Sequence, residues 1–175
     1  MTILGLSHMK NSFILSILII SSPQTSAEEM KEQIWHRDSK DYQTYSVNSY
    51  DSNYQAVMRK IHSKGDSPAH IDFRLIMEQS FCNDKGDDFN TTSIIEVNSQ
   101  EVEFSLGCSD GRLMNIVPLN KRGKYYILEE FEQYISKNVT FVWAKEGGKD
   151  LVFNFSTEGF KNYYRPIRKS TKKPI

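Results

Sequence analysis

The alternation of apolar and polar side chains in two stretches, interrupted only at Ile76, constrains the fold of this chain more than any other feature. From His70 to Met77, and again from Glu101 to Cys108, every second residue is apolar. Successive side chains of a β-strand point to opposite faces, so each stretch predicts a strand with one face on a core and one in water. Sheets of this kind are commonly antiparallel. The two stretches therefore predict an antiparallel sheet.

Further segments rich in β-branched and aromatic residues, bounded by turn-forming residues, also predict strands. They are Tyr42–Val47, Tyr54–Ile61, Ser93–Val97, Arg112–Leu119, Lys124–Leu128, Val139–Ala144 and Leu151–Phe155. Tyr54–Ile61 also has apolar side chains at helical spacing, which would fit a helix. Hairpin connections are predicted at Asn98–Gln100 and at Lys145–Asp150, which contains a Gly-Gly pair, and a loop is predicted at Lys64–Pro68.

Helical signals are few. Glu129–Lys137 has an apolar stripe with acidic residues early and a lysine late, an order that complements the helix dipole. Ser156 can cap a short closing helix that runs to Tyr164. Glu28–Lys40 is compatible with a short helix or with a segment that lies over the core. The chain is therefore predicted to be mainly β (α+β): one antiparallel β-sandwich or curled-sheet domain with one or two short helices.

The N-terminal apolar run predicts export. Phe13–Ile20 is far shorter than the roughly 20 apolar residues of a membrane-spanning helix, but it fits the apolar region of a signal peptide. Lys10 precedes the run, Pro23 follows it, and residues 25–27 are small, as a cleavage site requires. We therefore predict a signal peptide at residues 1–27; the alternative is a buried N-terminal strand or helix.

The organisation of the chain follows from this cleavage. Met9 precedes Lys10 directly, so residues 1–8 would lie upstream of the natural start. A single globular domain is predicted at residues 28–164 and a flexible basic tail at residues 165–175. The predicted location is the periplasm or the extracellular space, with no stable membrane insertion after cleavage.

The predicted export determines how the two cysteines are interpreted. In an oxidising compartment, an even number of cysteines in a small domain indicates a disulfide, here Cys82–Cys108. In the cytosol the same pair would be two buried thiols. A metal site is the weaker alternative, because two cysteines without a nearby histidine fall short of four ligands.

The charge balance argues against nucleic acid as a partner. Removal of residues 1–27 takes away one cation, Lys10, and leaves 21 Lys and Arg against 22 Asp and Glu. A protein that contacts many phosphates needs an excess of basic residues. The basic residues of the predicted tail are a handle for an anionic surface or, as we favour, a solubilising end; they are Arg165, Arg168, Lys169, Lys172 and Lys173.

No motif predicts catalysis, a cofactor or a metal. His36, His62 and His70 are scattered, without the spacing of a helical zinc site, and the chain has no Gly-x-Ser-x-Gly motif. His36-Arg37-Asp38 shares only its letters with a kinase catalytic loop. The acidic loop Asn83–Asp88 departs from the EF-hand spacing, so a solvated turn is favoured over a calcium site. Asn90, Asn138 and Asn154 each begin a glycosylation sequon.

Three function classes remain. The favoured one is an exported soluble binding protein without catalysis, such as an inhibitor or immunity-type partner of an extracytoplasmic enzyme. Its partner would be a protein of the envelope or extracellular space, and aromatic side chains would be contact anchors: Tyr125, Tyr126, Trp143, Tyr163 and Tyr164. The alternatives are an accessory subunit of an envelope assembly and a small hydrolase of envelope polymers. The hydrolase would use carboxylates as acid and base: Asp87, Asp88, Glu101 and Glu103.

Overall fold

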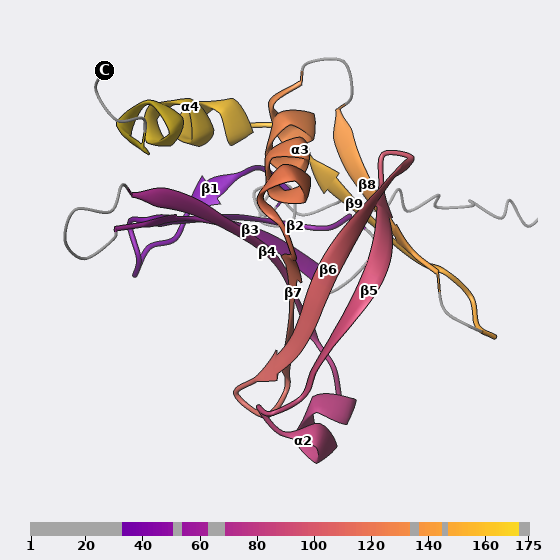
Figure 1. The fold of residues 1–175 in the computed structure, drawn as a ribbon. Helices are drawn as coiled ribbons and strands as arrows, with labels where there is room; N and C mark the ends of the chain where they lie inside the picture. The colour runs from indigo at the N-terminus through magenta and orange to yellow at the C-terminus, as the bar shows by residue number, and fades with distance from the viewer. Residues whose placement is uncertain (1–32, 51–53, 63–68, 134–136, 145–146, 172–175) are drawn as a thin grey trace, which may run out of the picture.

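A nine-stranded antiparallel sheet forms the body of the protein in the computed structural model, which describes residues 33–50, 54–62, 69–133, 137–144 and 147–171. In spatial order the strands are β1 (His36–Arg37), β2 (Thr44–Asn48), β3 (Tyr54–Ile61), β4 (His70–Glu78), β7 (Leu113–Pro118), β6 (Gln100–Ser109), β5 (Asn90–Val97), β8 (Asn138–Trp143) and β9 (Leu151–Ser156). Of the two architectures expected from the sequence, the curled sheet is the observed one (Figure 1). The predicted signal peptide and the predicted loop at 64–68 lie outside the described residues.

The alternation predicted for β4 and β6 is confirmed. Ile71, Phe73, Leu75 and Met77 are buried on one face of β4, and Val102, Phe104, Leu106 and Cys108 are buried on one face of β6. Tyr54–Ile61 is a strand and not a helix, and it pairs with β4 along its whole length. Between β5 and β6, Asn98 and Ser99 have φ values of 45° and 70°. Two consecutive positive φ angles are typical of the tight hairpin turn that was expected here.

The two edges of the sheet meet at one corner. Ser49, which follows β2, forms a β-bridge with Phe155 of β9, and the Tyr50 amide donates to the Asn154 carbonyl at 3.0 Å. Trp35 reinforces this corner, because its amide donates to the Glu158 carbonyl at 3.0 Å and its indole Nε1 to the Ser156 carbonyl at 2.9 Å. Trp35 is therefore part of the core, but His36–Arg37 forms the edge strand β1, which neither alternative for Glu28–Lys40 included, and residues 28–32 lie outside the described residues.

Helix α3 (Lys121–Glu132) corrects two predictions from the sequence. Lys124–Leu128 is not a strand, and the helix predicted at Glu129–Lys137 begins at Lys121 and ends at Glu132. The reason is a cap: the Asn120 side chain accepts a hydrogen bond from the Gly123 amide at 2.8 Å and starts the helix early. The residues that α3 buries follow helical spacing: Gly123, Ile127, Leu128 and Phe131.

Helix α4 (Phe160–Thr171) corrects the predicted tail. Pro166 lacks a backbone N–H and disfavours a helix interior, which is why the sequence predicted an end near Tyr164. The helix continues because Ile167 is buried and because Arg165 and Arg168 each donate to the carboxylate of Glu132 at 3.0 Å. Residues 165–171 are therefore helical, whereas Lys172 and Lys173 lie outside the described residues. Ser156 closes β9 and does not cap α4.

A third helix brings the number in the described residues above the one or two expected. It is α2 (Phe81–Lys85), and the predicted disulfide Cys82–Cys108 joins it to β6, with a Cα–Cα distance of 5.5 Å. The disulfide is thus confirmed, and the described residues contain no free cysteine.

The core lies between the concave side of the sheet and the helices α3 and α4 (Figure 1). Its centre is a cluster of aromatic rings: the indole of Trp35 packs edge-on against Phe131 and Phe160, with ring centroids 5.2 and 4.9 Å apart. Phe131 also contacts Phe73 from the sheet. Both helices are thus fixed to the sheet by their large apolar side chains. Within the described residues no helix covers the convex face of the sheet, here called the outer face.

Candidate functional site

The aromatic residues expected to be contact anchors do not form one surface. Tyr164 is buried and stacks on Phe160, with centroids 5.1 Å apart, and the half-buried Tyr163 packs against Tyr45 at 4.7 Å. These tyrosines hold α4 on the sheet and are not available to a partner.

Two more of the expected anchors use their polar atoms inside the protein. The Tyr126 hydroxyl donates to the Val97 carbonyl at 3.0 Å, and the Trp143 Nε1 donates to the Ser93 hydroxyl at 2.9 Å. Of the five expected residues only Tyr125 is exposed, with 52% of its surface accessible.

The carboxylates named for a hydrolase fall into two groups at opposite ends of β6. Asp87 accepts a hydrogen bond from the Gly111 amide at 3.2 Å, beyond the C-terminal end of β6. Glu101 and Glu103 lie near the N-terminal end of the same strand. A strand of this length spans roughly 30 Å, so the two groups cannot act on one bond. Within the described ranges no three His, Cys, Asp or Glu side chains gather as a metal site.

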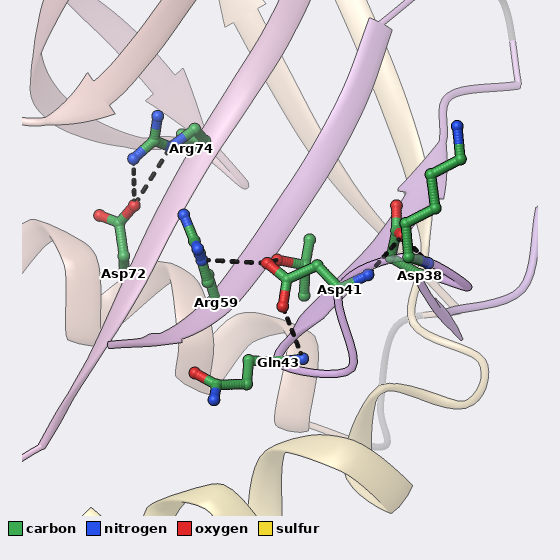
Figure 2. Close-up of polar contacts among 8 residues, drawn as sticks. Asp38, Asp41, Gln43, Arg59, Asp72 and Arg74 are labelled. Atoms are coloured by element: carbon green, nitrogen blue, oxygen red, sulfur yellow. Dashed lines mark hydrogen bonds and ion pairs between the residues drawn. The ribbon is translucent and has the colours of Figure 1, made fainter. Parts of the chain in front are cut away.

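The Asp38 carboxylate, part of the triplet with kinase-like letters, organises a turn (Figure 2). It accepts the backbone amides of Lys40 at 2.7 Å and Asp41 at 3.0 Å. The Asp41 carboxylate accepts the Thr44 hydroxyl at 2.7 Å and the Gln43 amide at 3.0 Å, and it pairs with Arg59 of β3 at 3.3 Å. These contacts of both carboxylates lie within the turn and with β3, which indicates a structural role.

These hydrogen bonds predict the titration of the turn. Donation by the Asp41 amide lowers the pKa of Asp38, and donation by the Thr44 hydroxyl lowers the pKa of Asp41, both below the ordinary value of 3.8. A carboxyl with a lowered pKa stabilises the fold above its unfolded pKa, and this contribution disappears as the pH falls through the folded value. We expect an NMR titration to give both carboxyls a midpoint below pH 3.8. Thr44→Val should raise the pKa of Asp41 and leave that of Asp38 unchanged; no change at Asp41 would contradict this account.

The outer face carries one cluster of exposed apolar side chains, here called the outer patch. Ile94 is 58%, Leu119 48% and Val152 45% exposed. Strand register places them together: Val152 faces Val142 on the next strand, and Val142 faces Glu96 of β5. The patch thus crosses the strands β9, β8, β5 and β6 and reaches the end of β7.

Three glutamates lie among these apolar side chains. Glu96 on β5 faces Glu101 on β6 directly. Glu103 on β6 faces Ile94 on β5, and on its other side the Glu103 carbonyl accepts a hydrogen bond from the Leu119 amide at 2.9 Å. Like charges directly opposite in an antiparallel pair are destabilising, by roughly 0.2–1 kcal/mol. None of the three forms an ion pair with another residue in the part of the chain that the structure describes.

A shallow groove of about 380 Å³ adjoins the outer patch at the N-terminal end of β6. Glu101, Glu103 and Arg122 line it, and Arg122 lies beyond ion-pair distance from both carboxylates. The carboxylates of the outer patch therefore keep their negative potential toward solvent. The sequence predicted that Glu101 and Glu103 lie on the solvent-exposed face of a strand. That Glu96 faces them, and that apolar residues of β8 and β9 lie nearby, follows only from the strand order.

The remaining candidates occupy separate places. His36, on β1, lies with Nε2 3.5 Å from the Ser46 hydroxyl, while His62 follows β3 and His70 begins β4. Among the sequon asparagines, Asn90 is exposed and Asn138 and Asn154 are half-buried. No helix of the described residues is long and apolar enough to span a bilayer.

The site and the fold together define a disulfide-linked, curled antiparallel sheet with two helices on its concave side and an acidic, partly apolar outer face. Comparison with protein-family models, with curated proteins and with solved structures found no match.

Proposed function

We propose that this protein is an exported binding protein without catalytic activity of its own, and that it docks onto a partner protein through the outer patch. The observation that supports this most is the pair of facing carboxylates, Glu96 and Glu101, set among exposed apolar side chains. This arrangement costs stability in the free protein, and a partner that brings Lys or Arg against it would offset that cost.

The partner is accordingly a protein that presents basic side chains around an apolar contact. Exposed apolar patches rimmed by polar groups mark interaction surfaces, and charge complementarity speeds association and selects the partner. An inhibitor or immunity-type protein of an extracytoplasmic enzyme would act in this way. The hydrolase alternative loses support, because Asp87 lies at the opposite end of β6 from Glu101 and Glu103, and the groove that these two glutamates line is shallow.

Site-specific crosslinking in the native host tests the surface. A photoreactive amino acid in place of Ile94 should give a discrete protein adduct. The same group in place of Tyr42 should not, because Tyr42 is 71% exposed but lies just before β2, which four strands separate from β5 in the sheet order. Equal adduct patterns at both positions, or none at position 94, would count against the outer patch as an interface.

Charge reversal then tests the chemistry of the partner. We expect Glu103→Lys to weaken binding of the crosslinked partner at least about tenfold, because like charges across an interface cost several kcal/mol. Glu129→Lys is the matched control, since Glu129 is exposed on α3, on the other side of the sheet, and it should bind nearly as well as the parent protein. A surface plasmon resonance titration at two salt concentrations measures both. Equal losses for the two variants would mean that net charge, and not this surface, governs binding.

A further inference from the structure

A pocket of about 600 Å³ opens where the ends of α3 and β9 meet the start of α4. Phe131, which is fully buried, lies beneath the pocket surface, and Tyr50, 42% exposed, contributes an accessible aromatic ring. The turn that leads from β9 into α4 forms one wall through Glu158, and the first turns of α4 form another. Sites for small molecules are commonly concave, partly apolar and about 300–1,000 Å³ in volume. The size of this pocket and the exposed ring of Tyr50 fit that class.

The charges around the pocket are unequal. Among its described lining residues are three cations, Lys137, Lys161 and Arg165, and one carboxylate, Glu158, while a second carboxylate, Glu132, pairs with Arg165. A concave site with an excess of one sign of charge concentrates counter-ions of the other sign. The pocket is therefore suited to an anion, although the chain as a whole has no net charge.

Arg165 is held in position before any ligand arrives. Its Nε donates to one oxygen of Glu132 at 3.0 Å, and Arg168 donates to the other oxygen at 3.0 Å. The Glu132 side chain is only 19% exposed, so both ion pairs are anchored on α3. A guanidinium has five N–H donors in a rigid fork, and within the described residues the pairing with Glu132 uses the Nε side. The remaining donors of an oriented arginine suit a carboxylate or a phosphate.

We propose that this pocket, here called the α3–α4 pocket, binds an anionic amphiphile: a molecule with one carboxylate or phosphate group and an apolar body. Arg165 contacts the anionic group, with Lys137 contributing charge, and the apolar body lies toward Tyr50. This site is formed by α3, α4 and the end of β9, whereas the outer patch lies on the convex side of the sheet. The two sites are separate and each can be tested without the other.

Titration with defined probes tests the ligand class. Dodecanoate and dodecyl phosphate, each below its micelle-forming range, should bind the purified disulfide-bonded protein with a 1:1 stoichiometry by calorimetry. Dodecyltrimethylammonium, with the same chain and the opposite charge, should bind at least tenfold more weakly. A preference for one of the two anions distinguishes a carboxylate from a phosphate ligand, and either preference supports the site. Acetate and inorganic phosphate should bind more weakly than the probes with an apolar chain.

Matched variants assign the site. Arg165→Gln should weaken dodecyl phosphate binding about tenfold or more, because a hydrogen bond to a charged group is worth about 1.5–3 kcal/mol. Lys169→Gln removes the same charge from the same helix outside the pocket and should change binding less than about twofold. Lys137 lies outside α4, and Lys137→Gln should also weaken binding. This second variant keeps the test valid if Arg165→Gln fails to fold.

Three results would overturn the proposal. The first is no binding of either anionic probe up to about 1 mM by a protein whose circular dichroism is that of a folded chain. The second is equal binding of the cationic probe, which would indicate contact with apolar surface alone. The third is an equal loss in Arg165→Gln and Lys169→Gln, which would indicate general attraction of anions to a basic helix.

Discussion

Replacing Cys82 and Cys108 together by alanine is expected to lower the free energy of unfolding by about 3.5 kcal/mol. The disulfide closes a loop with a sequence separation of 26 residues, and in the chain-entropy account a loop of this length restricts the unfolded chain by about that amount. Both side chains are buried, at 0% and 7% exposure, so alanine leaves no unpaired polar group behind. A loss of this size is a large part of the 5–15 kcal/mol that stabilises a typical domain.

Urea denaturation of the parent and the variant measures this loss, and reduction provides the control. The reducing agent should destabilise the parent by a similar amount and leave the double alanine variant unchanged. The slope of unfolding free energy against urea should rise in the variant, because an uncrosslinked unfolded chain exposes more surface. A change below about 1 kcal/mol would mean that the bridge does little to restrict the unfolded state.

The parts of the fold that could be predicted from the sequence are those whose signal is local. In β4 and β6 the alternation states both that the segment is a strand and which face is buried, and both are confirmed. The hairpin at Asn98 and Ser99 was also visible, because its turn is made by adjacent residues. The disulfide required one further step, since two cysteines in a small chain pair only in an oxidising compartment.

The helices were predicted less well because their boundaries depend on other residues. Lys124–Leu128 is a short apolar run, and periodicity alone does not separate a buried strand from a helix of that length. The signal that would have placed the start of α3 is Asn120, a good N-cap residue. The end of α4 had no local signal, because its continuation beyond Pro166 follows from Glu132, which lies 33 residues before Arg165.

The candidate sites depended still more on long-range pairing. Glu101 and Glu103 were recognised as an exposed face, but their opposition to Glu96 and the proximity of Val142 follow from β8 pairing with β5 across the intervening strands and helix. Arg165 was placed in a tail, so nothing in the sequence suggested that it lines a pocket. A strand order of this kind is decided by which apolar faces can be buried together, which one segment does not specify.

Trp35→Ala is expected to be the most destabilising single substitution in the described residues, with a loss of about 4 kcal/mol, since removal of a buried Trp typically costs 3–5 kcal/mol. The side chain is 1% exposed and touches both helices, through Phe131 of α3 and Phe160 of α4. Its indole N–H also satisfies the Ser156 carbonyl at the end of β9. The substitution therefore removes apolar contact from the core and leaves a carbonyl without its donor.

Two variants separate these contributions. Trp35→Phe keeps a benzene ring and removes the N–H donor with the rest of the five-membered ring, so it should cost less than Trp35→Ala, about 1–3 kcal/mol, mainly from the unsatisfied carbonyl. Tyr42→Ala, at a side chain 71% exposed, should stay within about 0.5 kcal/mol of the parent. Chemical denaturation followed by circular dichroism measures all three. If Trp35→Ala were no less stable than Trp35→Phe, the hydrogen bond alone would account for the role of Trp35.

Hydrogen exchange locates the effect in the sheet. Trp35 lies at the corner where the Tyr50 amide donates to the Asn154 carbonyl and the two edges of the sheet meet. Because this corner is held by one β-bridge and a few hydrogen bonds, we expect the Tyr50 amide to lose protection in Trp35→Ala well before the central β4–β7 pairing does. Equal loss of protection in both places would show that the sheet opens as one unit, and that Trp35 acts through the core as a whole and not through its edge contacts.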